Sequence, residues 1–141
     1  MLRSRYAIAA AVGAALFLVV AGVAAYGALG QDNVPVTYDG YTLLRVRVSA
    51  GGMTAEQRAS EIQMRLEDLM AAQFADDTSD LVPHGIRVGR QAGEVVIVAG
   101  DQLLLTVTRE DARVNDTDPV WLARHWRDRV AQAMVIATRT G

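Results

Sequence analysis

The sequence predicts an α+β fold, in which an N-terminal transmembrane helix is followed by a two-layer sandwich of a small, mainly antiparallel sheet and two helices. Three observations support this prediction. Residues 6–29 contain no charged side chain. Two later segments, which begin near Thr54 and Pro119, repeat apolar residues at steps of three and four, as one face of a helix does. Short runs rich in Val, Leu and Ile lie around these segments, and this composition is typical of strands.

Residues 1–30 are predicted to be a membrane anchor or a signal segment. A membrane-spanning helix needs about 20 mostly apolar residues, whereas the apolar part of a cleaved signal has about 7–15. The uncharged length therefore favours an uncleaved anchor, although Ala28-Leu29-Gly30 also fits a cleavage site that would release a secreted domain. Because basic residues stay on the cytoplasmic side, Arg3 and Arg5 predict a cytoplasmic N-terminus and an extracytoplasmic remainder.

Small side chains in the anchor are compatible with packing against a second helix, and hence with a homo-oligomer. They belong to Ala10, Gly13, Ala14, Ala21, Gly22 and Ala25.

Residues 31–40 are interpreted as a linker, and the extracytoplasmic domain is expected over residues 41–141. The linker is polar, contains one proline and ends in Asp-Gly, which are features of turns and loops. Residues 41–49 then alternate, with Leu44 and Val46 on the face opposite to two arginines. This period of two predicts a half-buried strand.

The first helix of the domain is predicted to begin after Gly51-Gly52. Thr54 and Gln57 have the spacing of a capping box, in which each side chain bonds the backbone N–H of the other residue. The helix is expected to continue to about residue 75, where short polar side chains compete with the helical backbone. Its expected apolar face consists of Ala59, Ile62, Leu66, Leu69 and either Gln73 or Phe74.

A tight hairpin is the strongest local signal in the chain. Residues 94–99 and 102–108 are nearly continuous apolar runs, and the Gly100-Asp101 dipeptide between them favours a tight turn. A shorter strand is expected at residues 86–88.

A second helix is predicted to begin at Pro119. Asp118 is a favourable N-cap residue, and proline is well tolerated at the first helical position. The resulting order is strand, helix, three strands and helix, with a charged and polar connection at residues 109–118. The expected core stripe of the second helix consists of Leu122, Trp126, Val130, Ala133 and Ala137.

The charge distribution argues against nucleic-acid binding. All 14 basic residues are arginine, and the formal net charge is −2. Apart from Arg3 and Arg5, 12 arginines face 16 acidic residues, so the domain lacks the positive excess that neutralises phosphates. The absence of cysteine excludes disulfides, thiol nucleophiles and cysteine-ligated metals.

No residue pattern indicates an enzyme, a cofactor or a metal centre. The two histidines, His84 and His125, lack the spacing of zinc ligands, and no serine lies in a nucleophile motif. Acidic clusters occur at residues 76–80 and 110–118, but they lack the glycine and the bidentate glutamate of a calcium loop. Helix capping and solvated loops explain them better.

The candidate interaction surface consists of Trp121, Arg45, Arg47 and Arg124. Trp121 falls outside the apolar stripe that contains Trp126, and aromatic residues are enriched at protein interfaces. Arg45 and Arg47 lie on one face of the first strand. Arg124 lies on the second helix, together with Arg127 and Arg129. They either face anionic lipid head groups or are solvated.

Three segments, taken in order, resemble the N-terminal extracytoplasmic segment of some bacterial small-conductance mechanosensitive-channel-like proteins. They read TAEQRASEIQMRLE at residues 54–67, VVIVAGDQLLLTVTREDA at 95–112 and LARHWRDRVAQAM at 122–134. The resemblance covers about residues 40–135 and implies a sensor, assembly or interaction module. No channel helices follow residue 141 in this sequence, so conduction is not part of the expectation.

These features predict a cell-membrane protein whose extracytoplasmic domain interacts with, or modulates, an envelope complex such as a mechanosensitive-type channel. The expected partner is a protein that the sequence does not identify. The alternative is a secreted domain that binds a small ligand or a lipid after signal cleavage.

Overall fold

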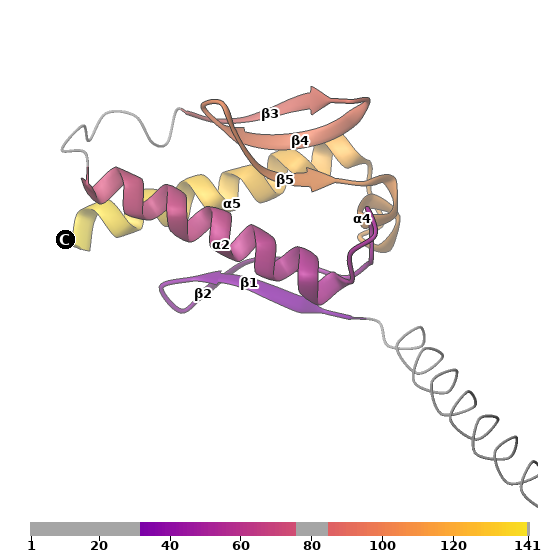
Figure 1. Cartoon of the computed structure of the whole chain (residues 1–141), viewed down its shortest axis with the longest axis horizontal. Helices are drawn as coiled ribbons and strands as arrows, with labels where there is room; N and C mark the ends of the chain where they lie inside the picture. The colour runs from indigo at the N-terminus through magenta and orange to yellow at the C-terminus, as the bar shows by residue number, and fades with distance from the viewer. Residues whose placement is uncertain (1–31, 76–84, 141) are drawn as a thin grey trace, which may run out of the picture. The chain divides into compact units, whose positions relative to one another are not determined.

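The computed structural model describes residues 32–75 and 85–140 (Figure 1), and residues 32–141 form one compact unit. The α+β class is confirmed. No helix in the described ranges is both long and apolar enough to cross a bilayer, and the predicted anchor at residues 1–30 lies outside them. The described elements are β1 (Val34–Tyr38), β2 (Tyr41–Val46), α2 (Ala55–Ala75), β3 (Ile86–Gln91), β4 (Glu94–Ala99), β5 (Gln102–Val107), α4 (Arg109–Val114) and α5 (Pro119–Thr140).

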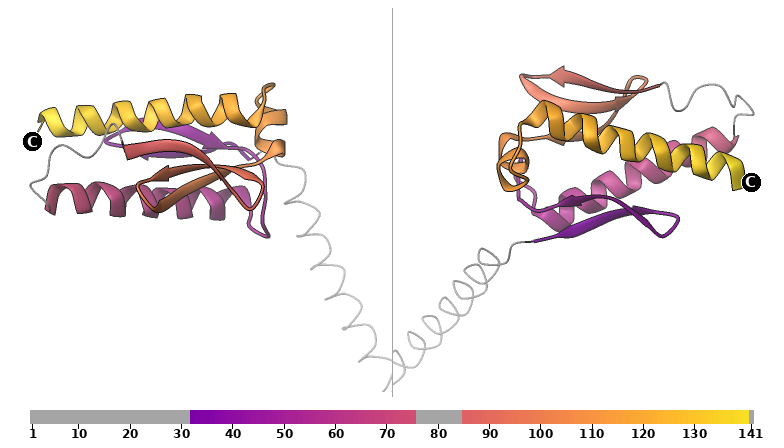
Figure 2. Two further views of the ribbon diagram at one scale, coloured as in Figure 1. Left: turned by 90° about the horizontal axis from the view of Figure 1, so that it is seen from above. Right: turned by 180° about the vertical axis from the view of Figure 1, so that it is seen from behind.

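The strands form two sheets instead of the expected single sheet. β1 pairs with β2 in a two-stranded antiparallel sheet, and β3, β4 and β5 form an antiparallel meander in that order. Figures 1 and 2 show α2 and α5 running between the two sheets. α2 packs on β1, β2 and β5, whereas α5 packs on β2 and on all three strands of the meander. A two-layer sandwich is therefore the wrong description, because each helix buries its apolar side chains against both sheets.

β1 lies within residues 31–40, which the sequence pattern assigned to a linker. Val36 in the middle of β1 is completely buried, and β1 pairs with β2 along its length. A two-residue turn joins the strands at Asp39 and Gly40, whose φ angles are 47° and 80°. Positive φ at both turn positions matches the twist of paired strands. The Asp-Gly dipeptide therefore closes a hairpin, and the linker prediction is wrong for residues 34–38.

The predicted hairpin at Gly100-Asp101 is confirmed. β4 and β5 pair across this turn, in which Gly100 has a φ of 58°. β3 extends to Gln91, beyond the expected residues 86–88, because all of its residues pair with β4. A second tight turn at Ala92-Gly93 joins these two strands.

Both predicted long helices form, and both have the expected N-terminal caps. At α2, the Thr54 N–H donates to Gln57 Oε1 at 2.9 Å, and the Gln57 N–H donates to Thr54 Oγ1 at 3.2 Å. At α5, the Asp118 carboxylate accepts hydrogen bonds from the N–H groups of Val120 and Trp121 at 3.0 and 2.9 Å.

α4 lies within residues 109–118, which the sequence pattern predicted to be a connection without a helix. Its cap is a second capping box. Thr108 Oγ1 accepts a hydrogen bond from the Asp111 N–H at 3.1 Å, and Asp111 Oδ2 accepts one from the Thr108 N–H at 2.9 Å. These reciprocal bonds satisfy two backbone donors that a helix of six residues leaves open.

One apolar core joins both sheets and both long helices. Trp126 and Leu122 of α5 are buried as expected, and so are Ile62 and Leu66 of α2. Ile97 of the central strand β4 is completely buried. The outer side of α5 and parts of its two flanks stay outside this core.

Candidate functional site

α5 carries most of the residues that are candidates for binding. Its core stripe includes Leu122, Trp126 and Val130, which point into the domain. Successive residues of a helix are turned by about 100°, so side chains three or four positions apart share a flank. One flank of α5 borders β2 and the other borders β3, and each border contains a hollow.

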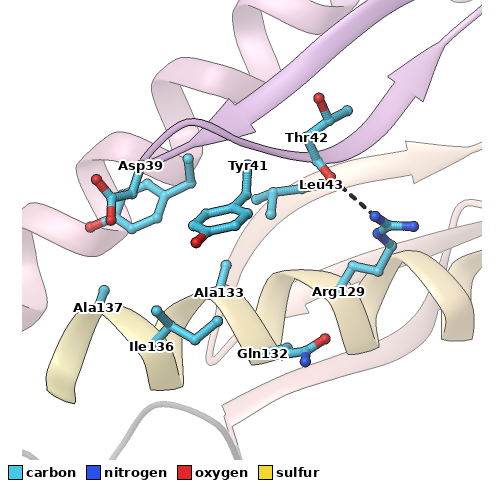
Figure 3. A pocket seen from close by; sticks show the side chains of 10 residues that line it. Asp39, Tyr41, Thr42, Leu43, Arg129, Gln132, Ala133, Ile136 and Ala137 are labelled. Carbon is cyan, nitrogen blue, oxygen red and sulfur yellow. Dashed lines mark hydrogen bonds between the residues drawn. The ribbon is translucent and has the colours of Figure 1, made fainter. Parts of the chain in front are cut away.

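The flank toward β2 borders a groove of about 390 Å³ (Figure 3). Tyr38 and Tyr41, on either side of the hairpin turn, line it from one side, and Ile136 lines it from α5. Leu43 and Ala133 are buried lining residues. Tyr41 is 61 % exposed and Ile136 is 40 % exposed. The groove therefore presents apolar and aromatic surface to the solvent.

Polar groups stand beside this apolar surface. Arg129 Nη2 donates to the carbonyl oxygen of Thr42 at 3.3 Å, which connects α5 to β2 along the groove (Figure 3). Asp39 and Gln132 also line the groove. A few polar groups around an apolar hollow are typical of sites for small ligands.

Trp121 and His125 form a stacked aromatic pair on the outside of α5. Their ring centroids are 5.3 Å apart and the ring planes differ by 10°. Side chains four positions apart on a helix are neighbours, which brings the two rings together. Trp121 is 56 % exposed, whereas Trp126 is 5 % exposed. The predicted difference between the two tryptophans is confirmed.

The flank toward β3 borders a cleft of about 480 Å³ that is rich in arginine. Arg87 and Arg90 of β3 and Arg124 and Arg127 of α5 line it, and no Asp or Glu is among its lining residues. The other lining residues are valines and one glycine. The cleft is therefore chemically distinct from the groove beside β2.

The four residues of the predicted interaction surface have different environments. Trp121 and Arg124 are exposed and lie three positions apart on α5, and Arg45 is exposed on β2. Arg47 Nη1 donates a 2.8 Å hydrogen bond to the carbonyl oxygen of Val114, the last residue of α4. Helix ends leave carbonyl groups unsatisfied, so this bond gives Arg47 a structural role. Arg45 Nη1 donates a 3.5 Å hydrogen bond to the carbonyl oxygen of Asn33. Trp121 and Arg124 are therefore the members of this surface that are most available to a ligand.

A buried ion pair between Arg58 and Asp111 was not found from the sequence. Arg58 Nη1 and Nη2 donate to Asp111 Oδ1 and Oδ2 at 2.9 and 2.7 Å. Arg58 also donates to the carbonyl oxygens of Val48 and Thr106 at 2.7 and 3.3 Å. No buried polar side-chain atom in the described residues lacks a partner. This pair therefore holds α2, β5 and α4 together. A local pattern does not reveal it, because its residues are 53 positions apart.

The shifted pKa values belong to surface groups that line neither hollow. A hydrogen bond from Arg113 lowers the pKa of Glu110, and the same bond raises the pKa of Arg113. The pKa of Glu56 is lowered by a hydrogen bond from its own backbone N–H and by one from the Thr54 hydroxyl. These shifts come from local pairs at helix ends.

Within residues 32–75 and 85–140, no group of His, Asp and Glu side chains is arranged to hold a metal ion. His84, one of the two histidines, and the acidic cluster at residues 76–80 lie outside the described residues.

Comparison with known proteins identifies one related family. A sequence profile described as a domain of unknown function, DUF8459, matches residues 35–137. No curated protein and no solved structure matches the chain. The match includes nearly all of β1 and most of α5, so it covers both the groove beside β2 and the cleft beside β3.

Proposed function

This chain belongs to the DUF8459 family of domains of unknown function, and we propose that it is a membrane-anchored, extracytoplasmic domain that acts by binding a protein partner in the cell envelope. The Trp121–His125 stack carries this proposal. A large aromatic side chain at 56 % exposure offers apolar area that the domain itself does not bury. Tyr and Trp are enriched at interfaces, and stacking against His125 restricts the indole before a partner arrives.

The membrane part of the proposal rests on sequence. Residues 6–29 are uncharged, and Arg3 and Arg5 precede them. A domain that is held at the bilayer meets other membrane proteins at a high effective concentration, so a small contact surface is enough for binding. The resemblance to segments of mechanosensitive-channel-like proteins makes a channel-type protein the first partner class to test.

We propose that the domain acts by binding a partner and not by catalysing a reaction. The sequence contains no nucleophile–base pattern, and the buried ion pair of Arg58 and Asp111 has its hydrogen-bonding groups committed to the fold. Exposed aromatic and guanidinium side chains on the surface of α5 are available for binding. Such groups are suited to recognition.

Site-specific photocrosslinking in native membranes tests the contact. A photoreactive amino acid replaces Trp121 in one full-length variant and Met64 of α2 in the control, because both side chains are 56 % exposed. We expect a specific crosslinked protein from position 121 and not from position 64. Equal crosslinking from both positions, or none from position 121, contradicts the proposal. The same experiment on residues 31–141 without the anchor should give a much weaker product.

A second candidate function is binding of a small apolar ligand or a lipid after signal cleavage, and the groove beside β2 favours it. Its volume of about 390 Å³ is within the range of ligand pockets. Saturable binding of a pyrene-labelled fatty acid to the purified domain tests this function. Tyr41→Ala should weaken binding, because Tyr41 lines the groove, whereas Met64→Ala on α2 should not. Identical binding by both variants contradicts it.

A further inference from the structure

We propose that the cleft between β3 and α5 is a binding site for a multiply charged, phosphate-bearing anion. The cleft has a volume of about 480 Å³ and is lined by Arg87 and Arg90 of β3 and by Arg124 and Arg127 of α5. The two pairs come from elements that are distant in the sequence. Tertiary structure, and not a local basic run, therefore brings the four guanidinium groups to one hollow.

The positive charge of the cleft is opposite in sign to the net charge of the domain as a whole. Outside the first 30 residues, 12 arginines face 16 acidic residues, yet no Asp or Glu lines the cleft. An adjoining hollow, which shares Arg90, Val95 and Val120 with the cleft, is lined by Glu94 together with Arg109. Because like charges repel across a partly apolar hollow, a bound anion stabilises this arrangement.

Among residues 32–75 and 85–140, two of the four arginines of the cleft have hydrogen-bond partners for their side chains, and the other two, Arg90 and Arg124, have none. Arg127 donates to Asp128 Oδ1 from Nε at 2.8 Å and from Nη2 at 2.6 Å. Arg87 Nη2 donates to a backbone carbonyl at 3.4 Å. Arg90 and Arg124 form no ion pair with the described residues, and both are exposed. Their donors are therefore available to a ligand.

The chemistry of these donors favours phosphate. A planar guanidinium group donates two parallel hydrogen bonds to phosphate oxygens, a geometry that other cationic side chains do not offer. Arg90 and Arg124 reach the cleft from opposite elements, one from the strand and one from the helix. Val88, Val95 and Val120 form an apolar part of the lining, which strengthens the attraction to an anion by lowering the local dielectric constant.

Two sources supply this chemistry, the phosphate head group of an anionic lipid and a soluble phosphate compound. A cleft of this volume accommodates either a head group or a small phosphate ester. The inference shares Arg124 with the candidate interaction surface, but it depends on the arginines of the cleft and not on the Trp121–His125 stack, which carries the proposed partner contact.

Calorimetric titration with pyrophosphate tests the site, using the full chain in a neutral detergent at low salt. The cleft variant is Arg90→Gln/Arg124→Gln. The control variant, Arg113→Gln/Arg139→Gln, removes the same charge from exposed positions that neither line the cleft nor belong to the candidate interaction surface. We expect the cleft variant to bind pyrophosphate about tenfold more weakly than the native chain, and the control variant to stay within about twofold. Circular dichroism and the thermal midpoint check that both variants fold.

A vesicle-binding experiment distinguishes a lipid head group from a soluble phosphate compound as the ligand. Residues 32–141, which form a compact unit with their own core, are sedimented with phosphatidylcholine vesicles and with vesicles that also contain phosphatidylglycerol. Binding only to the anionic vesicles, with loss in Arg90→Gln/Arg124→Gln, supports the site and identifies a lipid head group. Pyrophosphate binding without vesicle binding supports the site and identifies a soluble ligand. If neither probe binds, or if the cleft and control variants lose binding equally, the proposal is overturned.

Discussion

Arg58 and Asp111 form a buried ion pair. Its net contribution to the stability of the domain depends on complete hydrogen bonding of both side chains. The side chains are 7 % and 1 % exposed, so both charges have left water. Desolvation of a charge is expensive, and it is compensated only when the geometry of the pair is good and the remaining donors and acceptors are satisfied. Here the bidentate contact is completed by two backbone carbonyls on the arginine side and by Thr108 on the aspartate side.

Asp111→Ala should lower the free energy of unfolding by about 3–5 kcal/mol, because it leaves the Arg58 guanidinium buried and unpaired. Urea denaturation measures this loss. The double variant Arg58→Met/Asp111→Leu should lose much less than the sum of the two single variants, since both charges are then absent. As a control, Glu61→Ala at the half-exposed pair with Arg65 should cost about 1 kcal/mol or less. A cost for Asp111→Ala as small as that of the control contradicts this account.

The two tryptophans should differ strongly in their contribution to stability. Trp126 is 5 % exposed in the core and Trp121 is 56 % exposed on the surface. Trp126→Ala should cost about 3–5 kcal/mol, because it removes a large buried side chain and leaves a cavity. Trp121→Ala should cost far less in the isolated domain. Similar losses in denaturation experiments would mean that α5 is rotated about its axis.

At the scale of elements, the β1–β2 hairpin depends on the backbone conformation of its turn. Gly40 has a φ of 80°, in the left-handed region that other residues rarely adopt, although a Cβ atom there would meet no neighbour. Gly40→Ala should therefore destabilise the domain by about 1–2 kcal/mol through backbone strain alone. Gly89→Ala on β3 is the matched control, because no positive φ occurs there and the new Cβ makes only an ordinary 3.8 Å contact. Thermal denaturation compares the two variants, and equal midpoints would exclude turn strain.

α5 provides both candidate hollows because it lies against both sheets. A helix that packs on one sheet buries one stripe, whereas α5 contacts β2 on one flank and the meander on the other. Side chains at the borders of α5 with β2 and with the meander are only partly buried. Hollows therefore form at both borders. The ligand groove and the anion cleft therefore lie on different flanks of α5. The proposed partner contact is next to the cleft, because Trp121 is three positions from Arg124.

At the scale of the whole molecule, the proposed membrane tether would limit the partners that the domain can meet. A C-terminal fusion to alkaline phosphatase, which is active only after export, should be active in bacteria. Arg3 and Arg5 precede the uncharged segment, and basic residues there favour a cytoplasmic N-terminus. Reversing the bias with Arg3→Glu/Arg5→Glu should reduce that activity. An inactive fusion in export-competent cells contradicts the topology. Determination of the mature N-terminus by mass spectrometry then distinguishes an anchor from a cleaved signal.

Sequence patterns identified the long helices and one hairpin correctly because their signals are local. Thr54 and Gln57 are three positions apart, as the capping box requires. Thr108 and Asp111 have the same spacing, but the charged residues around them conceal this signal, so the sequence pattern does not predict α4. The Asp39-Gly40 dipeptide was also a hairpin signal, but the proline and polar residues before it concealed the short strand β1.

The candidate site was predicted only in part. Trp121 and Arg124 were named from their position outside the core stripe, which helical periodicity reveals. Arg87 and Arg90 were not named, because nothing in the sequence of a short strand indicates which helix lies beside it. Arg47 was named but holds the end of α4, and only the folded backbone shows that contact.

The sequence by itself determined the α+β class, the position of both long helices, the turn at Gly100-Asp101 and the uncharged N-terminal segment. Each of these depends on residues within a few positions of one another, where hydrogen bonds and periodicity act locally. Tertiary structure alone decided that the strands form two sheets, that Arg58 meets Asp111 and that four arginines line one cleft. These features depend on which apolar surfaces pack against one another. Hydrophobic attraction is not directional, so local sequence does not specify these pairs, and only the packing of the whole domain does.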